Sequence, residues 1–314
     1  MDGRVREWRP EWPCPVGSVL GVHRRGGGDP TYRIDRHADG DTHWRGIRTP
    51  DGPTTLAVRA RPGDGVVHAE AWGPGAAWVL DSLPALLGAE DDVRGFDPGP
   101  HPLVAEGWRR YPHWRLGRTG LVMESLVPAI IEQKVTGLEA FAGFRMLVHR
   151  YGERAPGPGP DLKLWVQPDP AILRRVPSWE WLRMHVDPAR SRALVSAARV
   201  ADALERTTGL PGGEVERRLT SLPGIGVWTA AEVRQRAHGD PDAVSFGDYH
   251  VAKDLGWAVA GRPFSDDEMA EFLEPWRPHR GRVPVLVALV AGRRERHGPR
   301  MAPRTHLPAR VTRR

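Results

Sequence analysis

The sequence is poor in cysteine, in lysine and in long apolar runs, and the shortage of cysteine and of apolar runs excludes whole classes of protein. Cys14 is the only cysteine among 314 residues. An internal disulfide, a zinc site with several cysteines and a four-cysteine iron–sulfur cluster are therefore excluded. No apolar run approaches the roughly 20 residues that span a bilayer, and the first residues lack the apolar stretch of a signal peptide. We expect a cytoplasmic protein without a membrane partner.

The net charge of +6 is concentrated at the C-terminal end. Residues 293–314 contain eight arginines and one acidic residue, Glu295, so the rest of the chain is close to neutral. This tail has three prolines and few apolar residues, a composition typical of disorder. Net charge alone therefore does not identify the folded part as a nucleic-acid-binding protein.

Residues 1–100 have the pattern of an antiparallel β domain with one helix. Turns rich in Gly, Pro and Asp separate runs of apolar and β-branched residues. These runs cover residues 16–23, 32–35, 43–47, 55–60 and 66–72. From Gly75 the apolar residues take helical spacing, with Pro84 as a kink.

Residues 101–292 have the pattern of an all-helical region. The longest predicted helix covers residues 121–150. Two further helices carry start signals: Asp187 precedes Pro188, and Ser265 is followed three residues later by Glu268. The other predicted helices cover residues 170–176, 213–221, 227–237, 249–259 and 282–293. The expected fold class is α+β, with the sheet first and the helices after it.

The most informative motif is a hairpin between two helices within residues 214–238. Its turn reads Leu222-Pro223-Gly224-Ile225-Gly226. Proline ends the first helix, and the two glycines allow a tight turn and the close approach of another backbone. The N–H groups at the start of the second helix, together with its dipole, suit a phosphate. An ordinary αα-hairpin with a glycine turn has the same local pattern, so the motif alone leaves both interpretations open.

A second motif follows this hairpin. Asp248 stands at the predicted start of another helix, after a strand-like run at 244–246. A carboxylate at this position caps the helix. The same carboxylate can also act in a cleft, so the two roles are compatible.

Together the motifs resemble the helix-hairpin-helix DNA glycosylase superfamily, and within it the 3-methyladenine DNA glycosylase II family. The stronger matches are the hairpin, Trp228-Thr229-Ala230 and Asp248-Tyr249, and the weaker ones are 129–136 and 276–280. The resemblance implies an N-terminal antiparallel β domain followed by an all-helical helix-hairpin-helix glycosylase fold.

The resemblance also implies the site. Asp248 is the expected catalytic carboxylate, because breaking an N-glycosidic bond builds positive charge on the deoxyribose. The base must first leave the stack, and aromatic side chains commonly receive it. The expected base-pocket residues are Trp228, Gln133, Tyr249 and Glu232. The expected DNA-binding residues are Pro223, Gly224, Ile225, Gly226, Thr229 and Lys134.

Position 228 bears on the mechanism. Relatives that nick the strand through a Schiff base carry lysine at this place in the hairpin, whereas this chain has Trp228. We therefore expect a monofunctional enzyme of base excision repair that releases alkylated purines such as 3-methyladenine. Lys134 replaces the family's apolar wedge, and Glu232 and Ala288 replace aromatic pocket residues. Because of these departures, the resemblance predicts the type of reaction more directly than it predicts which damaged base is released.

Two alternatives stay open at this stage. One is a related glycosylase that acts on hypoxanthine or uracil, and the other is a non-catalytic helix-hairpin-helix DNA-binding protein. In every case the expected partner is double-stranded DNA, and the protein is expected to be a monomer. No cofactor or metal site built from side chains is expected, and the resemblance implies only a structural monovalent cation at the hairpin backbone.

Overall fold

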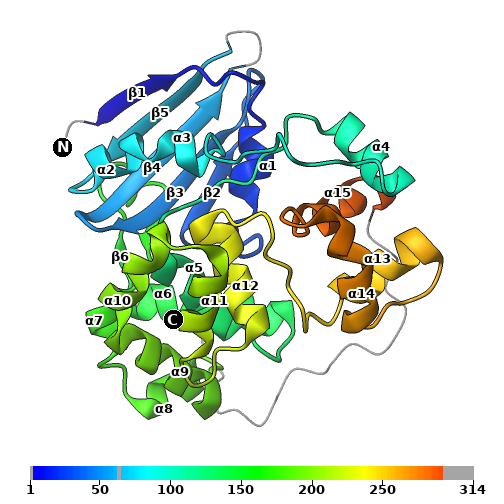
Figure 1. Cartoon of the computed structure of the whole chain (residues 1–314). Helices are drawn as coiled ribbons and strands as arrows, with labels where there is room; N and C mark the ends of the chain where they lie inside the picture. The colour runs from blue at the N-terminus through cyan, green and yellow to red at the C-terminus, as the bar shows by residue number, and fades with distance from the viewer. Residues whose placement is uncertain (1–2, 62–64, 293–314) are drawn as a thin grey trace.

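The N-terminal region forms a five-stranded antiparallel sheet (Figure 1). The computed structural model describes residues 3–61 and 65–292, and the predicted basic tail lies outside the described residues. The strand order across the sheet is β1-β5-β4-β3-β2. The strands are β1 (Arg4–Trp8), β2 (Tyr32–Asp35), β3 (Thr42–Thr49), β4 (Gly52–Ala60) and β5 (Val67–Trp72).

Four of these strands confirm predicted β runs. In β5, buried Val67, Ala69 and Ala71 alternate with partly exposed residues, the pattern of a sheet with one covered face. β1 has no counterpart among the predictions, because its two arginines and one glutamate interrupt the apolar alternation. It is an edge strand that pairs only with β5 among the sheet's strands described here.

The segment predicted as a strand at 16–23 is instead the helix α1 (Val16–Gly21). Val16, Val19 and Leu20 are its buried residues, and their spacing places them on one helical face. A strand would have turned one of the neighbours Val19 and Leu20 away from the core. The sheet, α1, α2 (Ala76–Asp81) and α3 (Leu83–Leu86) share one hydrophobic cluster. The break between α2 and α3 lies at Ser82, just before Pro84.

A helical body follows, with α5 (Val122–Ile131) at its centre. Every residue of α5 except Glu124 is buried. Around it pack α6 (Gly137–Tyr151), α7 (Pro170–Leu173), α8 (Ser178–Arg183), α9 (Pro188–Arg199), α10 (Ala201–Glu205), α11 (Gly212–Thr220) and α12 (Val227–Val233). A short ribbon of β6 (Glu153–Arg154) and β7 (Trp165–Val166), the 3-10 turn η1 (Arg206–Gly209) and the π-turn η2 (Arg234–His238) complete this body.

The prediction of a single long helix over 121–150 is wrong, because α5 ends at Ile131 and a new helix, α6, begins at Gly137. Thr136 and Glu139 form a capping box that starts a new helix at Gly137. Lys134 lies in the left-handed region with a φ of 54°, which no continuous helix allows. The break brings residues 132–136 to the end of α5, beside the hairpin between α11 and α12.

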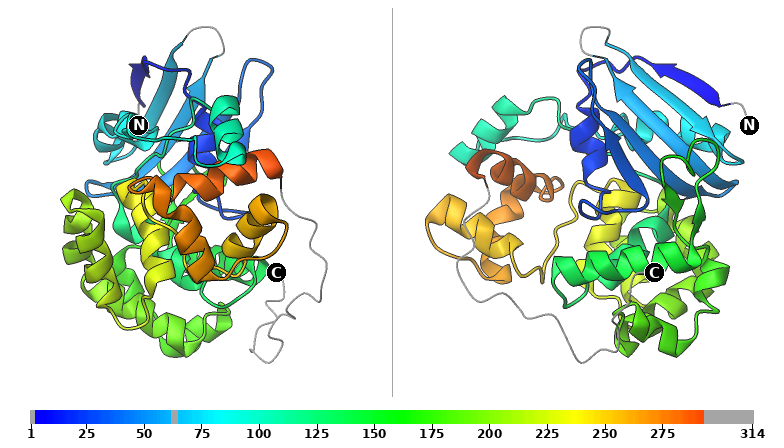
Figure 2. Two further views of the ribbon diagram at one scale, coloured as in Figure 1. Left: turned by 45° about the vertical axis from the view of Figure 1, so that its right-hand side comes forward. Right: turned by 180° about the vertical axis from the view of Figure 1, so that it is seen from behind.

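The remaining helices form a third group (Figure 2). It contains α4 (Pro102–Arg110), α13 (Val251–Ala260), α14 (Asp266–Leu273), η3 (Glu274–Trp276) and α15 (Arg282–Ala291). The earliest of them, α4, packs against the last, α15, around buried Val104 and Leu286. The chain reaches this group from η2 through residues 239–250. No helix within 3–61 and 65–292 is long and apolar enough to cross a membrane.

Candidate functional site

The hairpin has the predicted geometry. α11 ends at Thr220, and α12 begins at Val227 after the turn. Gly224 has a φ of 86°, and a Cβ there would come within 3.0 Å of the Ala193 Cβ, so this position favours glycine on two counts. Ile225 is buried and anchors the turn in the core, whereas Pro223, Gly224 and Gly226 are exposed. No side chain caps α12 at Gly226, so the turn can present backbone N–H groups to an anion.

Gln133 ties the end of α5 to this hairpin. Its Nε2 donates to the Gly224 carbonyl at 2.9 Å and to Thr229 Oγ1 at 2.8 Å. Thr229 is buried, so the bond to its hydroxyl is partly shielded from competition with water, whereas the bond to Gly224 is exposed. The amide of Gln133 therefore positions the hairpin, and its nitrogen is already engaged.

Asp248 lies where α12 and α13 converge, and each of its carboxylate oxygens has a donor. Oδ1 accepts from the backbone N–H groups of His250 at 2.7 Å and Val251 at 3.0 Å, so Asp248 holds the turn that leads into α13, whose N-cap residue is His250. Oδ2 accepts from the indole Nε1 of Trp228 at 3.2 Å. The predicted strand-like run at 244–246 is wrong, since these residues form no strand. Asp248 follows Gly247, whose φ of 84° turns the chain into the helix.

Glu232 lies one turn after Trp228 on α12 and is fully engaged. Its Oε2 accepts from Arg236 and its Oε1 from the Ser245 hydroxyl, both at 2.6 Å. Burial opposes ionisation of Glu232, but the charges of Arg236 and Arg25 and the Ser245 hydrogen bond hold its pKa below the ordinary value. Glu232 is thus a carboxylate that stays charged in a buried setting.

A second carboxyl, that of Glu132, lies beside this group and was missed from the sequence. Its Oε1 lies 3.5 Å from the guanidinium of Arg25, which comes from the loop after α1. Burial raises the pKa of Glu132 against the opposing charges of Arg25 and Arg236, and the negative charges of Glu232 and Asp248 add to the increase. Glu132 precedes Gln133 in a segment that the sequence did single out, whereas no local signal identifies Arg25.

Two other predicted site residues, Tyr249 and Lys134, are exposed to solvent. Tyr249 is 73% exposed, and the Lys253 Nζ sits 3.6 Å from its ring centre. Its ring also meets that of His250 edge-on. Lys134 is exposed at the break between α5 and α6. The structure therefore groups Asp248, Trp228, Glu232 and Gln133 around the hairpin and leaves Tyr249 and Lys134 on the surface.

Among the described residues, no group of three or more His, Cys, Asp and Glu side chains could hold a metal ion. At the hairpin, the carbonyl of Leu222 accepts from the Ile225 N–H and that of Gly224 accepts from Gln133. Neutral carbonyl oxygens suit a hard cation such as Na⁺ or K⁺ better than a soft metal. The monovalent cation stays a prediction.

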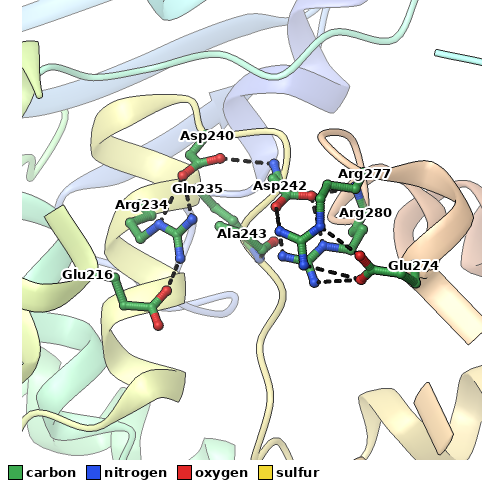
Figure 3. Close-up of polar contacts among 9 residues, drawn as sticks. All are labelled: Glu216, Arg234, Gln235, Asp240, Asp242, Ala243, Glu274, Arg277 and Arg280. Atoms are coloured by element: carbon green, nitrogen blue, oxygen red, sulfur yellow. Dashed lines mark hydrogen bonds and ion pairs between the residues drawn. The ribbon is translucent and has the colours of Figure 1, made fainter. Parts of the chain in front are cut away.

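The chain segment between η2 and Asp248 is fastened by ion pairs on both sides (Figure 3). Arg234 pairs with Asp240 and with Glu216 of α11. Arg280 holds Asp242 through two bonds, at 2.7 and 2.8 Å. Glu216, Arg234, Asp242 and Arg280 line a pocket of about 390 Å³ that does not include Asp248. We interpret the pairs as a clamp that fixes α13 relative to α12, and so Asp248 relative to Trp228.

Known proteins resemble this chain in sequence and in fold. No family model matches the chain. The probable bifunctional transcriptional activator/DNA repair enzyme AlkA of Mycobacterium tuberculosis is 29% identical over 202 residues, which cover 60% of this chain and 36% of that protein. The chain thus spans about a third of the length of the curated relative that it matches.

Two solved structures share the fold. The 3-methyladenine DNA glycosylase of Archaeoglobus fulgidus superimposes with a TM-score of 0.72 at 18% identity, over 90% of this chain and 96% of that one. The 8-oxoguanine glycosylase/lyase of Clostridium acetobutylicum superimposes with a TM-score of 0.59 at 14% identity, over 83% and 99%. These likenesses confirm the fold, a sheet followed by helices, that the sequence predicted.

Proposed function

We propose that the protein is a monofunctional DNA glycosylase that hydrolyses the N-glycosidic bond of alkylated purines in duplex DNA. The observation that carries this proposal is the double anchoring of Asp248, by the N–H groups of α13 and by the indole of Trp228. A pure phosphate clamp needs no fixed carboxylate beside its hairpin. A glycosylase does, because positive charge develops on the sugar as the base departs.

The roles of the residues follow from their positions. The exposed turn receives a DNA phosphate on the backbone N–H groups of Gly224 and Gly226. Trp228 holds Asp248 and offers a face to the flipped base. Asp248 stabilises the developing oxocarbenium ion and orients the attacking water. An alkylated purine already carries positive charge, so it leaves with little acid assistance.

The absence of lyase activity is part of the same proposal. Trp228 occupies the place where an amine nucleophile would stand in the hairpin. Lys253, one turn into α13, has its Nζ against the Tyr249 ring, and Lys134 is exposed at the break after α5. Borohydride trapping of a Schiff base on lesion-containing duplex tests this directly. We expect no trapped complex with the wild type.

The decisive experiment measures base release from duplexes that carry one defined lesion, with and without alkali. Strand cleavage only after alkali supports a monofunctional glycosylase, and cleavage without alkali contradicts it. Asp248→Asn should abolish release while duplex binding persists. Release from hypoxanthine or uracil alone would favour the sibling specificity. Binding without release from any lesion would leave a non-catalytic DNA-binding protein.

A further inference from the structure

Four charged groups, one buried and three partly buried, interact with one another and come from three parts of the fold. Arg25 belongs to the loop after α1, Glu132 to the end of α5, and Glu232 and Arg236 to the α12–η2 helix. We call these four residues the Arg25 cluster. Arg25 is deeply buried, and its pKa is lowered by burial, against the opposing charges of Glu132 and Glu232. The cluster has as many positive as negative groups, but its two carboxyl groups differ in the hydrogen bonds that they accept.

Both carboxylate oxygens of Glu232 accept hydrogen bonds, whereas Oε1 of Glu132 accepts none within the described residues. Both oxygens of Glu232 accept short hydrogen bonds, from Arg236 and Ser245. Oε1 of Glu132 is buried and accepts no hydrogen bond within the described part of the chain, because Arg25 stays 3.5 Å away. The Glu132 side chain nevertheless keeps 20% of its surface exposed. A buried carboxyl oxygen without a donor is costly, and the exposed fifth of the side chain gives a ligand access to the same residue.

The position of Glu132 places it at the proposed base site. It is followed directly by Gln133, whose amide donates hydrogen bonds to Gly224 and Thr229 of the hairpin. The negative charge of Asp248 contributes to the raised pKa of Glu132, so the two carboxyls are close enough to interact through space. Trp228 and Glu232 are four residues apart on α12 and share one helical face. A base that stacks on Trp228 would therefore lie near the Arg25 cluster, to which Glu132 belongs.

We propose that Glu132 contacts the flipped base and selects purines that bring a positive charge to it. This inference rests on the proposed function. A purine alkylated at a ring nitrogen carries delocalised positive charge and compensates a carboxylate that Arg25 only partly neutralises. A neutral base such as hypoxanthine supplies no such charge. Burial raises the pKa of Glu132 in the free protein, and the charges of Arg25 and Arg236 do not offset this increase. Charge complementarity thus takes over the selection that aromatic side chains provide in relatives.

The test compares two lesions in one preparation. We would measure single-turnover release of 7-methylguanine and of hypoxanthine from otherwise identical duplexes, and take the ratio of the two rates. Glu132→Gln keeps the shape of the side chain and removes its charge. We expect the ratio to fall at least about tenfold, the scale of one lost charge-assisted contact. The ratio is internal to each variant, so a loss of folded protein cancels.

Glu124→Gln is the matched control. Glu124 lies on the same helix, α5, and pairs with another arginine of the sheet domain, Arg45, at 2.7 Å. Asp248 is not among the charges that act on its pKa. We expect its ratio to equal that of the wild type. Glu132→Asp retains the charge at a shorter reach and should give an intermediate ratio, and it replaces Glu132→Gln if that variant does not fold.

The outcomes separate the two proposals. Wild-type protein that releases neither base contradicts the proposed function itself. Wild-type activity with an unchanged ratio in Glu132→Gln, or an equal fall in Glu124→Gln, contradicts only the role of Glu132.

Discussion

The indole of Trp228 donates a hydrogen bond to Asp248 across 3.2 Å and joins the helix after the hairpin to the helix that follows the linker. The bond leaves the second oxygen of Asp248 to the N–H groups of His250 and Val251. A carboxylate held from both sides keeps one orientation, which is what a preorganised electrostatic catalyst requires.

Trp228→Phe tests this relationship. The variant keeps an aromatic face for a base and loses the donor to Asp248. A hydrogen bond to a charged group contributes about 1.5–3 kcal/mol, so single-turnover base release should slow by about 10- to 100-fold. Duplex affinity should change little. Trp179→Phe, at a 62% exposed position on α8, is the control and should react at the wild-type rate. Equal rates in Trp228→Phe and the wild type would refute the orienting role.

Gln133→Ala tests the tie between α5 and the hairpin. The variant leaves the buried Thr229 hydroxyl and the Gly224 carbonyl without their shared donor. The free energy of unfolding should fall by about 1–3 kcal/mol in urea titrations. Gln133→Glu is isosteric but sets a carboxylate oxygen against the Gly224 carbonyl, which can only accept, so it should also destabilise the protein at pH 7, although the Thr229 hydroxyl can turn to donate. Unchanged midpoints in both variants would show that the tie contributes nothing.

Lys134→Ala tests a phosphate contact at the break between α5 and α6. We expect weaker duplex binding for all sequences, and a salt dependence reduced by about one phosphate contact in fluorescence anisotropy. Lys163→Ala is a close control, since Lys163 is also exposed and has a φ of 56°. An equal effect of both variants would indicate non-specific charge. Lys134→Gly should be at least as stable as Lys134→Ala, because glycine accepts the left-handed conformation.

Asp242→Asn tests the clamp on the linker and predicts a pH dependence. Burial opposes ionisation of Asp242, but the hydrogen bonds and charge of Arg280, with help from Arg277, hold its pKa below the ordinary 3.8. A lowered folded pKa stabilises the protein above the unfolded pKa, and this stability disappears as the pH falls through the folded value. The wild type should therefore exceed Asp242→Asn in unfolding free energy at pH 7. The difference should shrink below pH 3.8. A constant difference would contradict the assignment.

Cys14 provides a test of burial in the sheet domain. Burial raises the pKa of its thiol to about 12, against the opposing charge of Arg115. Only the thiolate attacks a disulfide reagent, so at pH 8 the folded protein should react at least about 100-fold more slowly than the denatured protein. Denatured protein should titrate a single thiol, because Cys14 is the only cysteine. Rapid reaction in the folded state would show that this thiol is accessible.

Local signals predicted several parts of this molecule correctly. The capping residues Asp187 and Ser265 start α9 and α14 where the sequence placed them. The Pro-Gly turn at 223–224 and the helix start after Asp248 depend on neighbouring residues only, so a sequence pattern is enough to locate them. The α1 helix was mispredicted because tertiary packing chooses there between two locally acceptable conformations. The break after α5 was missed although its capping box, Thr136 with Glu139, is a local signal.

The sequence by itself determined the order of sheet and helices, the hairpin and the position of Asp248 at a helix start. These features depend on proline, glycine and capping side chains acting within a few residues. Only the tertiary structure decided that Trp228 donates to Asp248 and that Gln133 donates to the hairpin. It also decided that Oε1 of Glu132 lies 3.5 Å from Arg25 and accepts no hydrogen bond within the described residues. Each of these contacts joins segments far apart in the chain, and packing of the buried core brings them together.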